Sequence, residues 1–298
     1  MLARSWLFVP GNSEKRLKKA ETLDSDIFIF DLEDAVGLDE KENARIILMN
    51  ALASSNKNVY VRVNSMDTPY FFEDLKTLFS KPSAALKGIM LPKAADAKKI
   101  HFLEQLLEFY ERQTNLEERL EIVPLIESAI GVHNCFEIAI SSERVHRLVF
   151  GAIDYALDVN IMPSSDSREL LYVRSQLANA SRAAGIEPPI DTVYVDFGNK
   201  EGMEAETEQA RKLGFSGKLA VHPSQIAIIN KNFSPSESDI LEAAEILAAA
   251  ERQGESAFQL NGKMVDEPIL KKARKTQKAA RLLQQHEKQD GVVKDGRK

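Results

Sequence analysis

Glu127 and Asp154 carry the clearest chemistry in the sequence, because each ends a short apolar run. If these two runs are neighbouring parallel strands, their carboxylates converge at one edge of a sheet. Two carboxylates, with water or substrate oxygens completing the shell, are a usual ligand set for Mg²⁺. We therefore expect a magnesium site at this edge. The alternative is that both carboxylates only form ion pairs with Arg62 or Lys93.

Arg62 lies inside the apolar run VYVRVN, where a guanidinium is costly to bury without an anion. Its planar fork suits a substrate carboxylate or the developing oxygen of an enolate. Glu33 and Asp34, which end another apolar run, are alternative partners for Arg62 within the protein. The two interpretations are compatible, and both bring Arg62 together with acidic groups.

Basic residues cluster in the segment PGNSEKRLKKA, which follows the first apolar run. Backbone N–H groups at a helix start, with Arg16 and Lys19 nearby, favour phosphate. A cluster of this kind is also typical of a solvated helix face. The other runs end in further polar residues: Asp31, Asn64, Lys93, Ser128, Asp196 and His222.

Eight apolar runs alternate with segments of helical periodicity. The runs predict strands at 5–10, 27–34, 58–64, 88–93, 121–128, 147–154, 192–197 and 218–223. The segments between them predict helices at 13–24, 39–54, 70–80, 94–112, 130–141, 166–184, 201–213 and 224–231. Eight β-then-α units in series favour an α/β fold of the TIM (β/α)₈ barrel type, with an open doubly wound sheet as the alternative.

The chain is expected to divide into a catalytic barrel at residues 1–232 and a C-terminal helical extension at residues 233–298. A helix is predicted to begin near Ser236, with acidic residues in its first turn. The loop SAFQLNGKMVDEP follows, and a second helix is predicted from about Ile269. Such an extension closes over its own barrel or acts as a lid over the active site of a neighbouring subunit.

Composition narrows the class of protein. Among 298 residues, 44% are hydrophobic and 28% are charged, which excludes extensive disorder. A net charge of −6 argues against nucleic-acid binding, and no apolar run reaches the roughly 20 residues that span a membrane. The single cysteine, Cys135, excludes a disulfide framework and suits a reducing compartment. A cytoplasmic enzyme is the expected class.

Eight motifs, in order along residues 4–280, resemble the citrate lyase β-subunit-like family of the HpcH/HpaI aldolase superfamily. This family includes malyl-CoA, citramalyl-CoA and citryl-CoA lyases. The motifs are RSWLFVPG at 4–11, DLEDAV at 31–36, VRVN at 61–64, LPK at 91–93, IES at 126–128, GAID at 151–154, HPSQI at 222–226 and KMVDEP at 263–268.

The resemblance implies a Mg²⁺-dependent TIM barrel that acts on coenzyme A or acyl-carrier thioesters of 3-hydroxy acids. It also implies a homotrimer or homohexamer, in which one subunit delivers an acid across an interface. By position, the resemblance implies that Glu127 and Asp154 bind the metal and that Arg62 binds the substrate. Glu33 and Asp34 match an acidic pair near the metal-bound water, and Arg16 and Lys19 match residues that contact phosphates. Asp266 matches the delivered acid, and Lys93 is a further substrate-binding candidate.

The reaction implied is a retro-Claisen cleavage between C2 and C3 of the hydroxyacyl thioester, which yields a keto acid and an acetyl-thioester. Arg62 would stabilise the negative charge that develops, and Asp266 would protonate the enolate carbon. Three alternatives stay open. The chain is a citryl-carrier lyase subunit of a citrate lyase complex, an aldolase for free hydroxy-keto acids, or a barrel that binds without catalysis.

Overall fold

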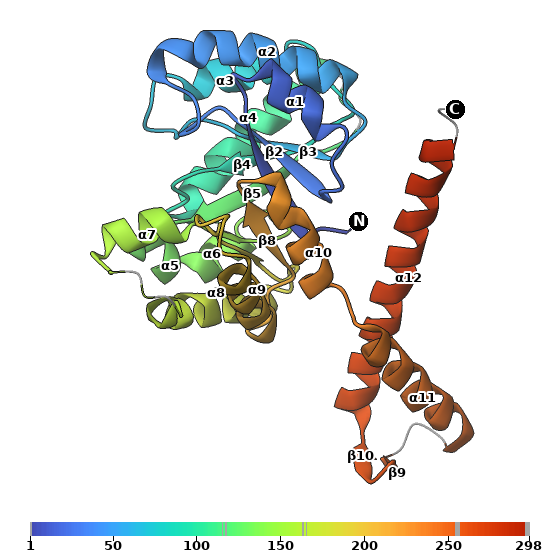
Figure 1. Ribbon diagram of the computed structural model, residues 1–298. Helices are drawn as coiled ribbons and strands as arrows, with labels where there is room; N and C mark the ends of the chain where they lie inside the picture. Colours follow the sequence, from blue (N-terminus) through green and yellow to red (C-terminus); the bar gives the residue numbers. More distant parts are fainter. Residues whose placement is uncertain are drawn as a thin grey trace. The chain divides into compact units, whose positions relative to one another are not determined.

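The computed structural model describes residues 2–114, 116, 118–162, 164, 166–253 and 257–295 (Figure 1). The chain divides into two compact units. The first spans Ala3–Lys231, and the second begins at Asn232. Among the residues described, no helix is long and apolar enough to cross a membrane.

The first unit is built on a closed barrel of eight parallel strands in sequence order. Closure is made by β1 and β8, where Ser5 pairs with Lys218 and Leu7 with Ala220. The predicted (β/α)₈ barrel is therefore confirmed, and the open doubly wound sheet is excluded. The strands are β1 (Ser5–Pro10), β2 (Ile27–Asp31), β3 (Val59–Arg62), β4 (Leu86–Leu91), β5 (Glu121–Ile126), β6 (Val149–Phe150), β7 (Ile190–Asp191) and β8 (Gly217–Ala220).

Helices follow the strands and cover the outside of the barrel (Figure 1). They are α1 (Glu14–Ala20), α2 (Lys41–Ser54), α3 (Phe71–Leu78), α4 (Ala97–Thr114), α5 (Ala129–His133), α6 (Cys135–Ile140), α7 (Ala152–Asp158), α8 (Leu171–Ala183), α9 (Lys200–Lys212) and α10 (Ile226–Phe233), with short 3₁₀ turns η1 (Leu38–Glu40), η2 (Arg168–Leu170) and η3 (Pro223–Gln225).

Alternate strand residues fill the barrel interior with large apolar side chains. Trp6 and Tyr60 are fully buried there, with ring centroids 4.9 Å apart. Because the interior is packed in this way, the barrel is a solid scaffold, and it leaves the strand ends to form a site.

Within the barrel, three predicted elements differ clearly from the structure. The strand predicted at 192–197 is wrong: β7 is formed by Ile190–Asp191 instead, and Asp196 lies in the exposed loop that follows. The run predicted at 147–154 is a strand only at β6, because the chain enters α7 at Ala152. The helix predicted at 130–141 is divided into α5 and α6 at Asn134.

Buried charges explain why β7 was not predicted. Asp191 is fully buried, and its carboxylate lies 2.6 Å from Nζ of Lys218 on β8 and 2.8 Å from Nε of Arg174 on α8. A strand with an aspartate, preceded by two prolines, does not read as an apolar run. Burial of its charge is tolerated because both cations compensate it.

The C-terminal unit consists of α11 (Glu237–Gln253), an antiparallel hairpin of β9 (Phe258–Leu260) and β10 (Lys263–Val265), and α12 (Glu267–Asp295). Both predicted helices are present. The hairpin replaces the predicted loop, and its turn is Asn261–Gly262 with positive φ angles of 50° and 77°. Asn-Gly is the preferred dipeptide for such a turn.

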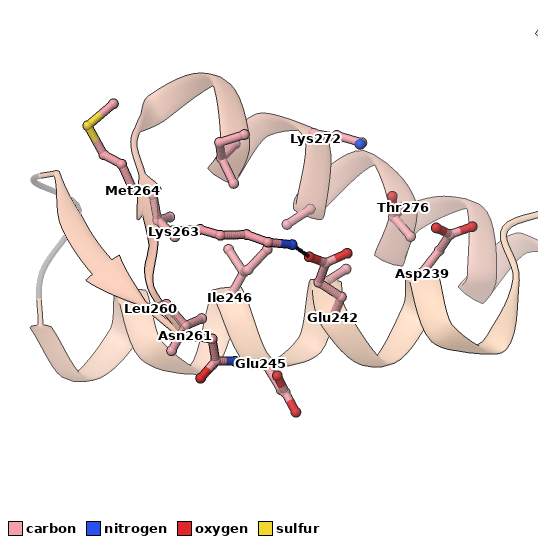
Figure 2. A pocket seen from close by; sticks show the side chains of 14 residues that line it. Asp239, Glu242, Glu245, Ile246, Leu260, Asn261, Lys263, Met264, Lys272 and Thr276 are labelled. Carbon is pink, nitrogen blue, oxygen red and sulfur yellow. Dashed lines mark hydrogen bonds and ion pairs between the residues drawn. The ribbon is translucent and has the colours of Figure 1, made fainter. Parts of the chain in front are cut away.

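The C-terminal unit has its own small core and a cavity of about 350 Å³ between α11, α12 and the hairpin (Figure 2). Val265 and Leu270 are buried in this core. Lys263 extends across the cavity, and its Nζ lies 3.2 Å from the carboxylate of Glu242.

Candidate active site

A cavity of about 480 Å³ opens where the barrel strands end. It lies at the C-terminal ends of the strands, the edge at which TIM-barrel enzymes place their active sites. Its wall takes residues from the ends of β2 and β3 and from the segments after β5, β6, β7 and β8: Asp31, Arg62, Glu127, Gly151, Thr192 and Val221.

Arg62 is the central cation of this cavity. Its Nε and Nη2 donate to the two carboxylate oxygens of Asp31 at 2.7 and 2.6 Å. Phe8 packs against the guanidinium, with its ring centroid 4.8 Å away. Burial alone would lower the pKa of Arg62, but Asp31 and the neighbouring carboxylates raise it. Arg62 is therefore a permanent cation, and its plane is fixed by Asp31.

Glu33 and Asp34 contact Arg62 at a different nitrogen. Their carboxylate oxygens lie 3.0 and 3.6 Å from Nη1. Glu33 is buried, and neither of its carboxylate oxygens accepts a hydrogen bond among the residues described, whereas Asp34 is exposed. Burial raises the pKa of Glu33 to about 7; Arg62 opposes this rise and Asp34 adds to it. Glu33 can therefore exchange a proton near neutral pH.

Glu127 is buried directly after β5 and is held from two sides. The backbone N–H of Lys93 donates to its Oε1 at 2.7 Å. Lys93 adopts a left-handed φ of 53°, a conformation that costs on the order of 1–3 kcal/mol in a residue with a side chain. On the other side, a Cβ at Gly151 would lie only 2.9 Å from Oε2 of Glu127. Glycine at this position makes room for the carboxylate.

Asp154 lines the same cavity from the first turn of α7. The hydroxyl of Thr192 accepts the N–H of Ala152 at 3.0 Å, which fixes the turn that carries Asp154. Burial raises the pKa of Glu127 to about 8; the Lys93 N–H opposes this rise, and Glu33 and Asp154 add to it. The charge of Asp154 therefore acts on the Glu127 carboxyl across the cavity that both residues line.

The donor set of the cavity fits Mg²⁺. Glu127 and Asp154 both offer carboxylate oxygens as ligands. The acidic residues that line the cavity carry more charge than the single positive charge of Arg62 offsets. The raised pKa of the buried Glu127 is a feature that a bound cation would relieve, and Gly151 leaves room beside its Oε2. Across the described part of the chain, no group of three or more His, Cys, Asp or Glu side chains is arranged for a metal. A Mg²⁺ site in this cavity would therefore take two carboxylate ligands from the protein and its other ligands from water or substrate.

A second cavity of about 450 Å³ contains Arg16 and Lys19, from α1. Arg16, Phe8 and Val221 line both cavities, so the two adjoin. His222 also lines the second cavity, where the ring of Phe197 stacks on it with centroids 5.0 Å apart. The structure therefore separates an acidic chamber from a basic and aromatic one.

The predicted residues thus fall into three places. Arg62, Asp34, Glu127 and Asp154 line the acidic cavity, and Glu33 contacts Arg62 without lining it. Arg16 lines both cavities, and Lys19 lines the basic one. Lys93 acts mainly through its backbone, since its half-exposed side chain approaches Glu33 only to 3.7 Å. Asp266 belongs to the C-terminal unit, where its carboxylate accepts the N–H of Ile269 at 3.3 Å.

Sequence reasoning missed three contributors. Asp31 was noted only as a strand-ending residue, although it is the closest partner of Arg62. Gly151 and Thr192 carry no ionisable group that would mark them as site residues. Gly151 leaves space for the Glu127 carboxylate, and Thr192 accepts a hydrogen bond from the first turn of α7. The signal for Gly151 was its place in the GAID motif. The signal for Asp31 was its position at the end of β2, which the β2–β3 register places opposite Arg62.

A closed parallel barrel with carboxylates and a buried arginine at its mouth has the architecture of a TIM-barrel enzyme. Comparison with known proteins gives the family. A family model described as HpcH/HpaI aldolase/citrate lyase matches residues 4–223. A model described as a C–C bond lyase of the TIM-barrel fold matches residues 173–283. The chain belongs to the HpcH/HpaI aldolase/citrate lyase family, as its motifs predict.

Individual relatives cover nearly the whole chain. The citrate lyase subunit beta of Leuconostoc mesenteroides subsp. cremoris is 37% identical over 94% of this chain and 93% of its own. The mitochondrial citramalyl-CoA lyase of Homo sapiens is 31% identical over 92% of this chain and 84% of its own. A solved structure of protein CitE from Mycobacterium tuberculosis, in complex with magnesium, acetoacetate and coenzyme A, has a TM-score of 0.76 and 29% identity, covering 94% of this chain and 98% of that one.

Proposed function

We propose that this chain is a Mg²⁺-dependent carbon–carbon lyase. It cleaves a 3-hydroxyacyl thioester of the citramalyl, malyl or citryl type to an acetyl-thioester and a keto acid. The observation that carries this proposal is the cavity that holds Glu127 and Asp154 together with the guanidinium of Arg62. Relatives named as citrate lyase subunit beta and citramalyl-CoA lyase support the same chemistry.

Glu127 and Asp154 hold the metal in this proposal. When bound, Mg²⁺ supplies Lewis acidity to the hydroxyl and keto oxygens of the substrate. The Lys93 N–H and the room at Gly151 keep the Glu127 carboxylate in place for this role. The magnesium in the solved CitE structure supports the choice of ion.

Cleavage breaks the bond between C2 and C3 of the hydroxyacyl group. The hydroxyl proton passes to Glu33, whose pKa of about 7 suits a base at neutral pH. The hydroxyl carbon becomes the ketone, and the electron pair of the broken bond forms the thioester enolate. Arg62 stabilises the negative charge that develops, and Asp34 adjoins the same guanidinium. Asp266 then protonates the enolate carbon, which gives the acetyl-thioester.

The thioester carrier occupies the basic and aromatic chamber. Arg16 and Lys19 suit the phosphates of coenzyme A or of an acyl carrier's phosphopantetheine. Lys93, near the acidic chamber, is a further candidate for contact with the acyl group. Coenzyme A in the solved CitE structure supports the first carrier, and the citrate lyase subunit relative supports the second.

The C-terminal extension, residues 233–298, is proposed to act as a lid that delivers Asp266 to a neighbouring subunit. Asp266 precedes α12 and is only half-buried within its own unit. A homotrimer or homohexamer and a cytoplasmic location complete the proposal. Analytical ultracentrifugation tests the assembly, and a mixture of Arg62→Ala and Asp266→Ala subunits tests the delivery, since mixed oligomers should recover activity.

The direct test is cleavage of citramalyl-, malyl- and citryl-CoA, and of a citryl-carrier thioester, with Mg²⁺ and with EDTA. We expect Mg²⁺-dependent formation of an acetyl-thioester from at least one substrate and none from Arg62→Ala. Turnover of a free hydroxy-keto acid without any thioester would instead identify an aldolase. Absence of cleavage and of Mg²⁺ binding would identify a non-catalytic barrel.

A further inference from the structure

Lys41 is a buried lysine behind the acidic loop that follows β2. It is the first residue of α2 and is only 5% exposed. Its Nζ donates to the backbone carbonyl oxygens of Leu32 and Glu33, each at 2.7 Å, and lies 5.8 Å from the ring centroid of Tyr70. Lysine is almost never buried to this extent without such partners.

We propose that Lys41 is a positioning residue of the lyase site: by hydrogen-bonding two consecutive carbonyls, its ammonium holds Glu33 against Arg62. This inference rests on the proposed function, because Glu33 is the base of that reaction. Lys41 donates to the backbone of the loop, so it acts through Glu33.

The backbone N–H and carbonyl groups of both Leu32 and Glu33 are hydrogen-bonded. Its N–H donates to Asp31 at 2.9 Å, and its carbonyl accepts the N–H of Val36 at 3.1 Å as well as Lys41. The N–H of Leu32 donates to the carbonyl of Arg62 at 2.9 Å. In the described part of the chain, Lys41 alone donates to the Leu32 carbonyl. Removal of the ammonium therefore leaves a buried backbone acceptor without a donor.

The side chain of Glu33 depends on this backbone. Its carboxylate is held only by charge, at 3.0 Å from Arg62 and 3.7 Å from Lys93, and accepts no hydrogen bond among the described residues. An ion pair has weaker directionality than a hydrogen bond, so the position of the carboxylate follows the position of the loop. A misplacement of about 1 Å at a catalytic group reduces rates by about 100-fold.

The charge of Lys41 matters as well as its two donors. Burial lowers the pKa of the Lys41 ammonium, and the carboxylates of Asp31, Asp74, Glu33 and Asp34 oppose this fall. The ammonium thus interacts with acidic groups from the end of β2, from the loop that follows it and from α3. A neutral side chain at this position would leave these carboxylates with less compensation.

Lys57 provides a matched control. Its Nζ donates to the carbonyl of Leu23 at 3.1 Å and lies 5.9 Å from the ring centroid of Phe28. Lys57 therefore has the same two kinds of contact as Lys41. It precedes β3, at the end of the barrel opposite the active site.

The experiment compares Lys41→Met with Lys57→Met in the full-length protein. Steady-state kinetics of Mg²⁺-dependent thioester cleavage give kcat and KM, and hydrogen exchange measured by mass spectrometry reports residues 31–36 without needing activity. For Lys41→Met we expect kcat to fall by roughly 10- to 100-fold, as for supporting partners of active-site groups, with little change in KM. We also expect faster exchange in residues 31–36. Lys57→Met should change neither kcat nor exchange in this segment.

Several outcomes would overturn the inference. They are an unchanged kcat in Lys41→Met, an equal loss in Lys57→Met, or unchanged exchange in residues 31–36. If Lys41→Met does not fold, Lys41→Gln replaces it, since its shorter, neutral side chain still removes the ammonium; a normal kcat there would contradict positioning by the ammonium. Inactivity of the wild-type protein on all thioesters would refute the proposed function instead, while the exchange result would still test the hold on the loop.

Discussion

Asp31 and Arg62 form a bidentate ion pair between the ends of β2 and β3. Both carboxylate oxygens of Asp31 are used, at 2.7 and 2.6 Å from Nε and Nη2 of the guanidinium. The pairing leaves Nη1 directed to Glu33, 3.0 Å away. Asp31 therefore determines which nitrogens of Arg62 remain available for the substrate.

The first prediction concerns this pair. Asp31→Asn should lower kcat for thioester cleavage by roughly 10- to 100-fold, because an amide has one acceptor oxygen and presents its NH₂ group to the guanidinium. Steady-state kinetics measure the effect. Asp196→Asn is the control, since Asp196 lies in an exposed loop and accepts the N–H of Gly198 at 3.1 Å. Equal activity of the two variants would exclude Asp31 as the residue that orients Arg62.

Gly151→Ala should weaken Mg²⁺ binding and abolish cleavage while the barrel stays folded. A Cβ at position 151 would lie 2.8 Å from Cβ of Glu127 and 2.9 Å from its Oε2, so the carboxylate must move. Calorimetry with Mg²⁺ and circular dichroism measure the two effects. Gly198→Ala is a suitable control, because a Cβ at position 198 would meet only the exposed carboxylate of Asp196, at 3.3 Å. Wild-type Mg²⁺ affinity in Gly151→Ala would show that Glu127 is not a ligand.

Mg²⁺ affinity should rise with pH between about 6 and 8 and release protons on binding. The pKa values of Glu33 and Glu127 are raised to about 7 and about 8, so both carboxyls hold protons in the metal-free protein at lower pH. The cation favours the charged forms and displaces these protons. Calorimetry in buffers of different ionisation enthalpy measures the proton count. Binding without proton release at pH 7 would contradict the raised pKa values.

Glu127→Gln should stabilise the metal-free protein at alkaline pH. Because the pKa of Glu127 is raised in the folded state, the folded protein holds a proton that the unfolded chain loses above its ordinary pKa of 4.5. Stability from this group is therefore present below that value and is lost as pH rises toward about 8. The Tm of Glu127→Gln should exceed that of the wild type increasingly from pH 5 to 9. The exposed Glu143→Gln should show no such trend.

Asp191→Asn should destabilise the barrel at pH 7 by about 3–5 kcal/mol, because it leaves Lys218 and Arg174 buried without their anion. Burial alone would raise the pKa of Asp191, but the two cations outweigh it and lower the pKa. The stabilisation is thus fully present above the ordinary pKa near 4 and is lost as pH falls from there through the lowered pKa of the folded state. Urea unfolding should give a larger difference between the variant and the wild type at pH 7 than at pH 3. Equal differences at both pH values would argue against a charged Asp191.

The barrel was predictable from the sequence because parallel strands that are covered on both faces read as apolar runs. β7 was not, since its buried aspartate is compensated by Lys218 and Arg174, which lie far away in the sequence. The β9–β10 hairpin was missed although its Asn261–Gly262 turn is a strong local signal. Local composition fails where long-range pairing or turn chemistry decides the element.

The same distinction applies to the site. The residue types at the strand ends were enough to predict that Arg62, Glu127 and Asp154 lie around one cavity. The contacts that orient them were not readable, because they depend on atoms rather than residue types. The left-handed backbone of Lys93, which supplies an N–H to Glu127, is an example that no side-chain pattern reveals.

The most direct measurement is the anomalous signal of Mn²⁺, used as a probe for Mg²⁺, in crystals of the full-length protein. We predict one strong peak in the acidic cavity, coordinated by the carboxylates of Glu127 and Asp154 and facing Arg62, that disappears in Asp154→Asn. A peak elsewhere, or none at saturating Mn²⁺, would contradict the metal site on which the lyase chemistry depends.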